Sequence, residues 1–212
     1  MLSIIFAMCL FALSMSISPG PVNLITLSAG LNHGFKRAMP FVSGATVGFT
    51  VLLLLTGLGI GSFATENPQL LTGLGYVGTA FIGYMGIKIA TSTPHIDISN
   101  DTSNQTSKTS APTFIHGFML TWINPKAWIA SLAGISAFGL ADSGAKLALF
   151  VILYFIICYA CISCWALLGS KISMAFAKPK NLRIFNRLMG GLLILVALFL
   201  GRSVGGSVSG LV

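Results

Sequence analysis

Two groups of proline and polar residues inside apolar stretches are the part of this sequence best suited to bind a ligand. The first group is Ser18, Pro19, Gly20, Pro21 and Asn23, and the second is Asn124, Pro125 and Lys126. A proline within a helix has no N–H donor and its ring clashes with the preceding turn, so each group predicts a helix break. In hydrocarbon, a break is tolerated only where protein buries it or a wet cavity surrounds it. We therefore expect the two breaks to form one internal site.

Each break is also predicted to begin a new helix. Pro21 and Pro125 suit the first helical position, whose amide has no partner in any case. Ser18 and Asn124 are expected to cap these helices. A helix N-terminus presents free N–H groups and partial positive charge, which favour a carboxylate. The alternative is that the prolines only kink the helices for packing.

Lys126 is the one Lys or Arg that the sequence places deep within an apolar stretch. A charge at the bilayer centre costs at least about 2.5–3.5 kcal/mol, so it requires a partner or a wet cavity. The four acidic residues all fall in predicted loops: Glu66, Asp97, Asp101 and Asp142. The missing anion is then predicted to be the carboxylate of a substrate. The alternative is a shallow lysine whose ammonium reaches the membrane interface.

The composition indicates a membrane protein. Hydrophobic residues make up 55% of the 212 residues and charged residues 8%, against about 25% charged residues in soluble domains. Apolar runs of about 20 residues recur, which predicts an all-α polytopic membrane protein. About six transmembrane helices are expected, at 2–31, 38–62, 70–91, 113–140, 146–170 and 185–204. The first stretch has no basic residue before it, so we expect it to be retained and not cleaved.

The chain is predicted to form a single transmembrane domain, 1–212, made of two halves. Residues 1–91 and 113–212 each contain three spans, and residues 92–112 form a polar linker that predicts a disordered cytoplasmic loop. Pro19 and Pro125 are 106 positions apart, half the length of the chain. A duplicated unit with an odd number of spans enters the membrane from opposite sides. The halves are therefore predicted to be inverted repeats with spans one and four broken.

The basic residues predict the orientation of these spans. The first, third and fifth loops and their edges carry nine of the 12 Lys and Arg residues, whereas Lys146 and Arg202 fall on the other side. Cytoplasmic loops are rich in Lys and Arg, so both termini are predicted to be extracytoplasmic. The formal net charge of +8 is explained in this way, and no nucleic-acid partner is expected.

Three cysteines in the fifth span offer a different function. Cys158, Cys161 and Cys164 recur at every third position, within an arc of about 120° of a helix. Such thiols could bind a soft metal or carry redox chemistry, although small polarisable helix packing explains them as well. No Ser–His–Asp set and no phosphate-binding glycine loop is recognisable. We therefore expect no catalytic residue, resident metal or cofactor, and neither an enzyme nor an ATP-driven pump.

Taken together, the motifs resemble those of a known family. The Ser18–Pro21 motif, glycine-rich second and third spans, the polar third loop, and Gly117-Phe118 followed by Asn124-Pro125-Lys126-Ala127 are similar to the LysE/RhtB family of small bacterial inner-membrane exporters. The resemblance covers essentially the whole chain. It implies proton-driven export of amino acids or related zwitterionic metabolites across the inner membrane. The partners are then a small-molecule substrate and the lipid bilayer, and a homo-oligomer remains open.

The sequence departs from that family in the second span. Many members carry an acidic residue near the glycine that Gly48 matches. Here Phe49 follows Gly48, and the span contains no acidic residue. The resemblance therefore identifies no proton-binding carboxylate in this chain.

Overall fold

The computed structural model describes residues 2–60, 68–91, 111–141, 143–175 and 179–209. All elements of this described part are helices. In chain order they are α1 (Leu2–Ile17), α2 (Pro21–His33), α3 (Phe35–Leu55), the π-helical turn η1 (Thr56–Ile60), α5 (Pro68–Ala90), α6 (Phe114–Ile123), α7 (Pro125–Phe138), α8 (Gly144–Ala175) and α9 (Pro179–Ser209). The predicted disordered loop lies almost entirely outside the described residues.

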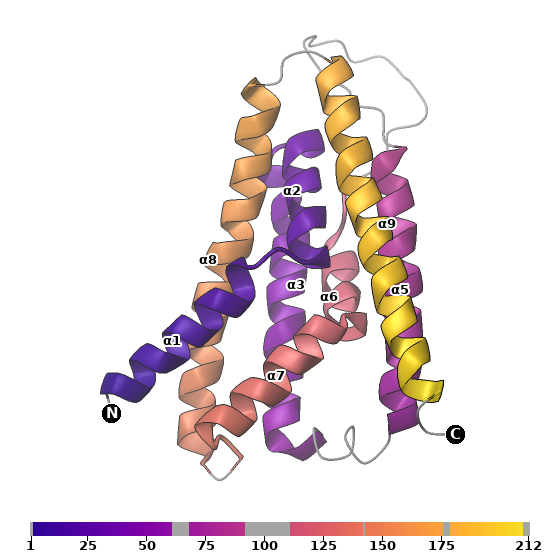
Figure 1. Cartoon of the computed structure of the whole chain (residues 1–212). Coiled ribbons are helices and arrows are strands. Elements are labelled where there is room, and N and C mark those ends of the chain that lie inside the picture. The colour runs from indigo at the N-terminus through magenta and orange to yellow at the C-terminus, as the bar shows by residue number, and fades with distance from the viewer. Residues whose placement is uncertain (1, 61–67, 92–110, 142, 176–178, 210–212) are drawn as a thin grey trace.

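Each predicted span corresponds to one helix or to a pair of helices. The four long helices α3, α5, α8 and α9 run roughly along the bundle, with α2 and α6 between them, whereas α1 and α7 run obliquely and α1 extends outward past α8 (Figure 1). Helix α8 and the segment Phe35–Gly59 are each long and apolar enough to cross a membrane, and α1 and α2 pass the same test together. Large apolar side chains such as Ile152 and Leu195 are exposed, as expected of surfaces that face lipid. The chain is a helical membrane protein.

Both predicted helix breaks are present. Helices α1 and α2 are bent by 60° across the short segment between them, and α6 ends immediately before Asn124. Pro21 and Pro125 occupy the first turn of α2 and α7, as predicted. In Figure 1 both breaks lie near mid-height of the long helices. The backbone therefore turns at two neighbouring places inside the bundle.

Glycines allow the helices beside the breaks to pack backbone to backbone. A Cβ on Gly30 would overlap the carbonyl oxygen of Ala166, so α2 lies directly on α8. Similarly, a Cβ on Gly44 would overlap the carbonyl oxygen of Phe114, so α3 lies directly on α6. Small residues at such crossings are typical of membrane helices. These two crossings fix the positions of α2 and α6, and hence of the breaks at their ends.

Candidate functional site

A cavity lies between the two breaks. Its empty volume, counting the part open to the outside, is about 480 Å³. Six helices contribute to its wall. The polar or sulfur-bearing lining residues are Met15, Ser16, Asn23, Thr121, Asn124, Lys126, Tyr154 and Cys158, and the others are Gly20, Val22, Ala45, Phe49, Ala127, Ala130 and Ile162.

Side chains satisfy the carbonyl groups that the first break leaves free. Asn23 Nδ2 donates to the carbonyl oxygens of Ser16, at 2.8 Å, and Ser18, at 2.9 Å. Trp165 Nε1 donates to the carbonyl oxygen of Ile17 at 3.2 Å. An unpaired carbonyl in a membrane costs on the order of several kcal/mol, so these bonds make the break tolerable. Asn23 is thus first of all a structural support of the break.

Lys126 connects the second break to the first. Its ammonium donates to the carbonyl oxygen and to the hydroxyl of Ser18, both at 2.8 Å. Gly20 leaves room for this side chain, since a Cβ there would lie 3.2 Å from Lys126 Nζ. The four acidic residues of the chain all lie outside the described segments. Within those segments the half-buried ammonium is therefore held by neutral oxygens.

The two new helices begin differently. Asn124 caps α7, its side chain accepting a bond from Lys126 N at 3.1 Å, which confirms the predicted cap. The predicted Ser18 cap is wrong, because Gly20 occupies the cap position of α2 without a side-chain bond. Ser18 instead donates to the carbonyl of Met15 and so ends α1. The first amides of α2, at Val22 and Asn23, consequently have no acceptor within their helix.

The predicted site residues therefore divide into two sets. Gly20, Asn23, Asn124 and Lys126 line the cavity, and Ser18 is joined to it through Lys126. The remaining three residues do not line the cavity and act through the backbone, namely exposed Pro19, buried Pro21 and half-buried Pro125.

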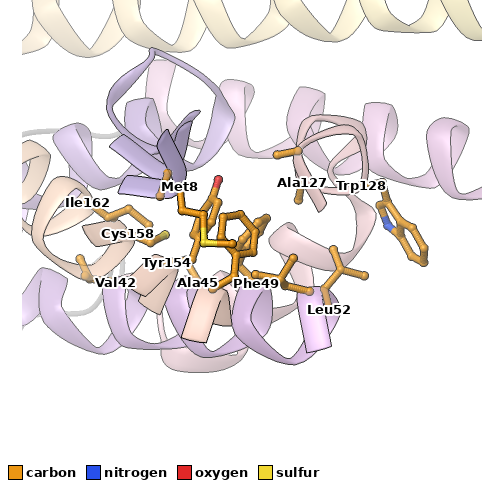
Figure 2. Close-up of a cluster of buried hydrophobic side chains, with 14 of the residues drawn as sticks. Met8, Val42, Ala45, Phe49, Leu52, Ala127, Trp128, Tyr154, Cys158 and Ile162 are labelled. Atoms are coloured by element: carbon orange, nitrogen blue, oxygen red, sulfur yellow. The ribbon is translucent and has the colours of Figure 1, made fainter. Parts of the chain in front are cut away.

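Sequence reasoning missed the wall opposite these breaks. Phe49 and Tyr154 stack there with ring centroids 4.4 Å apart, and Cys158 lies one turn of α8 beyond Tyr154. Figure 2 shows these three side chains gathered in one buried cluster with Met8 of α1. The spacing of Tyr154 and Cys158 indicates one helix face, but the sequence does not reveal which face of α8 turns inward.

The three cysteines of α8 lie in different surroundings. Cys158 and Cys161 are buried, whereas Cys164 is exposed. Among the described residues, no group of three or more His, Cys, Asp or Glu side chains is arranged to hold a metal ion. The thiol and metal alternative has no support from this geometry.

An internal cavity at two broken membrane helices is the arrangement typical of transporters. Comparison with known families agrees with this class. Residues 13–204 match the family model of the LysE type translocator. The chain therefore belongs to the LysE family, which confirms the resemblance noted in its motifs.

Several relatives are named for efflux. The chain is 28% identical over 169 residues to the cysteine/O-acetylserine efflux protein of Salmonella choleraesuis (strain SC-B67), and equally to that of Salmonella typhimurium. The protein of the same name from Escherichia coli O1:K1 is also 28% identical. Each alignment covers 78% of this chain and 82% of the relative. No solved structure matches the chain.

Proposed function

We propose that this protein is a secondary exporter of amino acids or related small zwitterions across the bacterial inner membrane. The observation that carries the proposal is the position of Lys126, whose ammonium lies in a cavity at two helix breaks and is held only by Ser18 among the described residues. The relatives named for efflux of cysteine and O-acetylserine support the same class of substrate, because both compounds carry an α-carboxylate and an α-ammonium.

A substrate carboxylate is the ligand that suits this end of the cavity. An ammonium has three donors, and two of them reach Ser18. The uncapped amides of α2 add donors and partial positive charge nearby. A carboxylate would accept hydrogen bonds from these groups and would also pair its negative charge with the ammonium, which neutral Ser18 cannot do. Lys126 would then release Ser18 and bind the substrate carboxylate during transport.

Helix packing supports six spans in two inverted halves. The middle spans of the halves, α3 and α8, pack on each other, and so do the last spans, α5 and α9. In addition, α3 packs on α6 and α8 packs on α1, so each middle span contacts the first piece of the other half's broken span. A two-fold relation between the halves would give these pairs, although α2 packs far more closely on α8 than α7 packs on α3.

The family resemblance also predicts that the proton gradient drives export. Collapse of that gradient should then stop export.

Substitution of Lys126 tests the carboxylate site. Lys126→Gln should weaken the apparent affinity for substrate roughly 10- to 150-fold, because one charge-assisted bond contributes about 1.5–3 kcal/mol. Lys126→Arg should also impair transport, since a planar guanidinium does not replace a compact ammonium. The measurement is efflux of small amino acids from cells or vesicles, at matched protein level, together with efflux of their carboxamides.

Lys146→Gln is the matched control, since Lys146 is an exposed lysine at the start of α8. It should transport like the wild type. Wild-type affinity in Lys126→Gln, or equal transport of acid and carboxamide by the wild type, would contradict the proposed carboxylate site.

A further inference from the structure

One hydroxyl in the cavity wall has no partner. Ser16 is 7% exposed and lines the cavity, and its Oγ makes no hydrogen bond within the described structure. Buried polar groups are nearly always hydrogen-bonded, and an exception calls for an explanation. The other unpartnered hydroxyls of the described segments belong to residues that do not line the cavity: Thr46, Thr79, Ser131 and Ser163. Among the described residues, Ser16 is therefore the one that both lines the cavity and carries a buried, unpartnered hydroxyl.

Two further polar groups lie beside this hydroxyl. Ser16 lies close enough to the phenol of Tyr154 and the thiol of Cys158 for a weak hydrogen bond to either group, but its Oγ reaches the full geometry of a hydrogen bond with neither. Both residues line the same cavity from α8. A hydroxyl, a phenol and a thiol together can donate and accept hydrogen bonds but carry no charge near neutral pH. This group suits a neutral polar ligand atom.

Ser16, and with it Tyr154 and Cys158, lies a short distance from Lys126. Asn23 Nδ2 bonds the carbonyl oxygens of both Ser16 and Ser18, and the Ser18 carbonyl also accepts from Lys126 Nζ. The side chain of Asn23 thus lies between Ser16 and the contact of Ser18 with Lys126. A ligand whose carboxylate contacts Lys126 needs only a short side chain to reach Ser16.

We propose that Ser16, with Tyr154 and Cys158, binds a hydroxyl or thiol on the side chain of the transported amino acid. This inference rests on the proposed function and deepens it, because it names small polar side chains as the preferred class. The ring pair of Phe49 and Tyr154 and the small residues Ala45, Ala127 and Ala130 bound the rest of the cavity. Lys126 is the charged residue among the described lining residues. The cavity therefore offers no second charge to pair with a charged side chain of the substrate.

Matched substrate pairs test the inference. Serine and alanine differ by one hydroxyl, and cysteine and 2-aminobutyrate differ by a thiol in place of a methyl group. The wild type should export serine and cysteine in preference to their partners. Ser16→Ala should reduce that preference roughly two- to tenfold, the effect of one neutral hydrogen bond, because export of serine and cysteine falls more than export of alanine and 2-aminobutyrate.

Ser131→Ala is the control, because Ser131 also carries a buried unpartnered hydroxyl but lies outside the cavity lining. It should keep the wild-type preference at equal protein level. An unchanged preference in Ser16→Ala would overturn the inference and leave the proposed exporter intact. An equal loss for all four amino acids would also overturn it, since Ser16 would then act on the shared α-amino acid group or on the fold. A wild type that exports none of the four would also overturn the inference, whereas the proposed exporter would be contradicted only if other amino acids and small zwitterions were not exported either.

Discussion

Lys126 reaches from one broken helix to the other because Gly20 has no side chain. The backbone of Gly20 is extended (φ −167°, ψ 176°), a conformation open to any residue. What requires glycine there is space, since a Cβ would lie 3.2 Å from both Cδ and Nζ of Lys126. Such a Cβ would push the Lys126 side chain, and with it the ammonium, aside by a few tenths of an ångström.

Gly20→Ala should therefore displace Lys126 without disturbing the backbone. We expect export of the substrate to fall several-fold while protein abundance and thermal stability stay close to wild type. Initial rates of efflux at matched abundance measure the effect. Gly191→Ala is the control, because a Cβ at Gly191 meets nothing within 4 Å. Unimpaired efflux in Gly20→Ala would show that the position of Lys126 does not limit transport.

At the residue level, the sequence indicates which side chains could bind a ligand better than it indicates which groups those side chains contact. Lys126 and Asn124 stand out because a charge and a capping side chain are unusual in an apolar segment. Ser16 does not stand out, since serine is common in membrane helices and its missing hydrogen bond exists only in the folded chain. Tyr154 and Phe49 look like ordinary apolar residues until α3 and α8 bring their rings together.

The helices themselves follow closely from the sequence, whereas their pairing does not. Proline chemistry predicts both breaks, and Pro21 and Pro125 begin new helices as expected. A glycine is only a small residue in the sequence, and its partner depends on which helix the fold places against it. Gly44 meets Phe114, 70 positions later in the chain, and no local pattern indicates that contact.

Gly44→Ala tests the contact between α3 and α6. The added methyl group would overlap a backbone carbonyl oxygen, which cannot swing aside as a flexible side chain can. Overpacking of this kind typically costs about 1–3 kcal/mol. We expect a lower midpoint of thermal unfolding in detergent, with Gly191→Ala unchanged or slightly more stable because alanine favours helix over glycine. A wild-type midpoint in Gly44→Ala would mean that the two helices are less closely packed than described.

Across the whole molecule, positive charge gathers at one end. The start of α3, the end of α5 and the start of α9 lie together at the upper end in Figure 1. Arg37, Lys88 and Arg183 belong to these three helix ends. Arg37 and Lys88 both lie near enough to His33, at the end of α2, to act on it electrostatically, so these basic groups share one region. By contrast, Lys146 and Arg202 belong to the start of α8 and the last part of α9.

This charge asymmetry predicts the orientation of the chain. Lys and Arg are enriched in cytoplasmic loops, so the end with Arg37 and Lys88 should face the cytoplasm. The start of α1 and the end of α9 both lie toward the opposite end of the bundle (Figure 1). An alkaline phosphatase fused after Val212 should then be active, and a green fluorescent protein at the same position should be dark.

Reporters at both ends of the chain separate this topology from its main competitor. If α1 and α2 cross the membrane as one broken span, the amino-terminal and carboxyl-terminal reporters must lie on the same extracytoplasmic side. If the pair instead forms a re-entrant hairpin, five crossings remain and the two reporters lie on opposite sides. A cytoplasmic carboxyl terminus would refute the orientation, and reporters on opposite sides would refute the six-span arrangement together with its inverted halves.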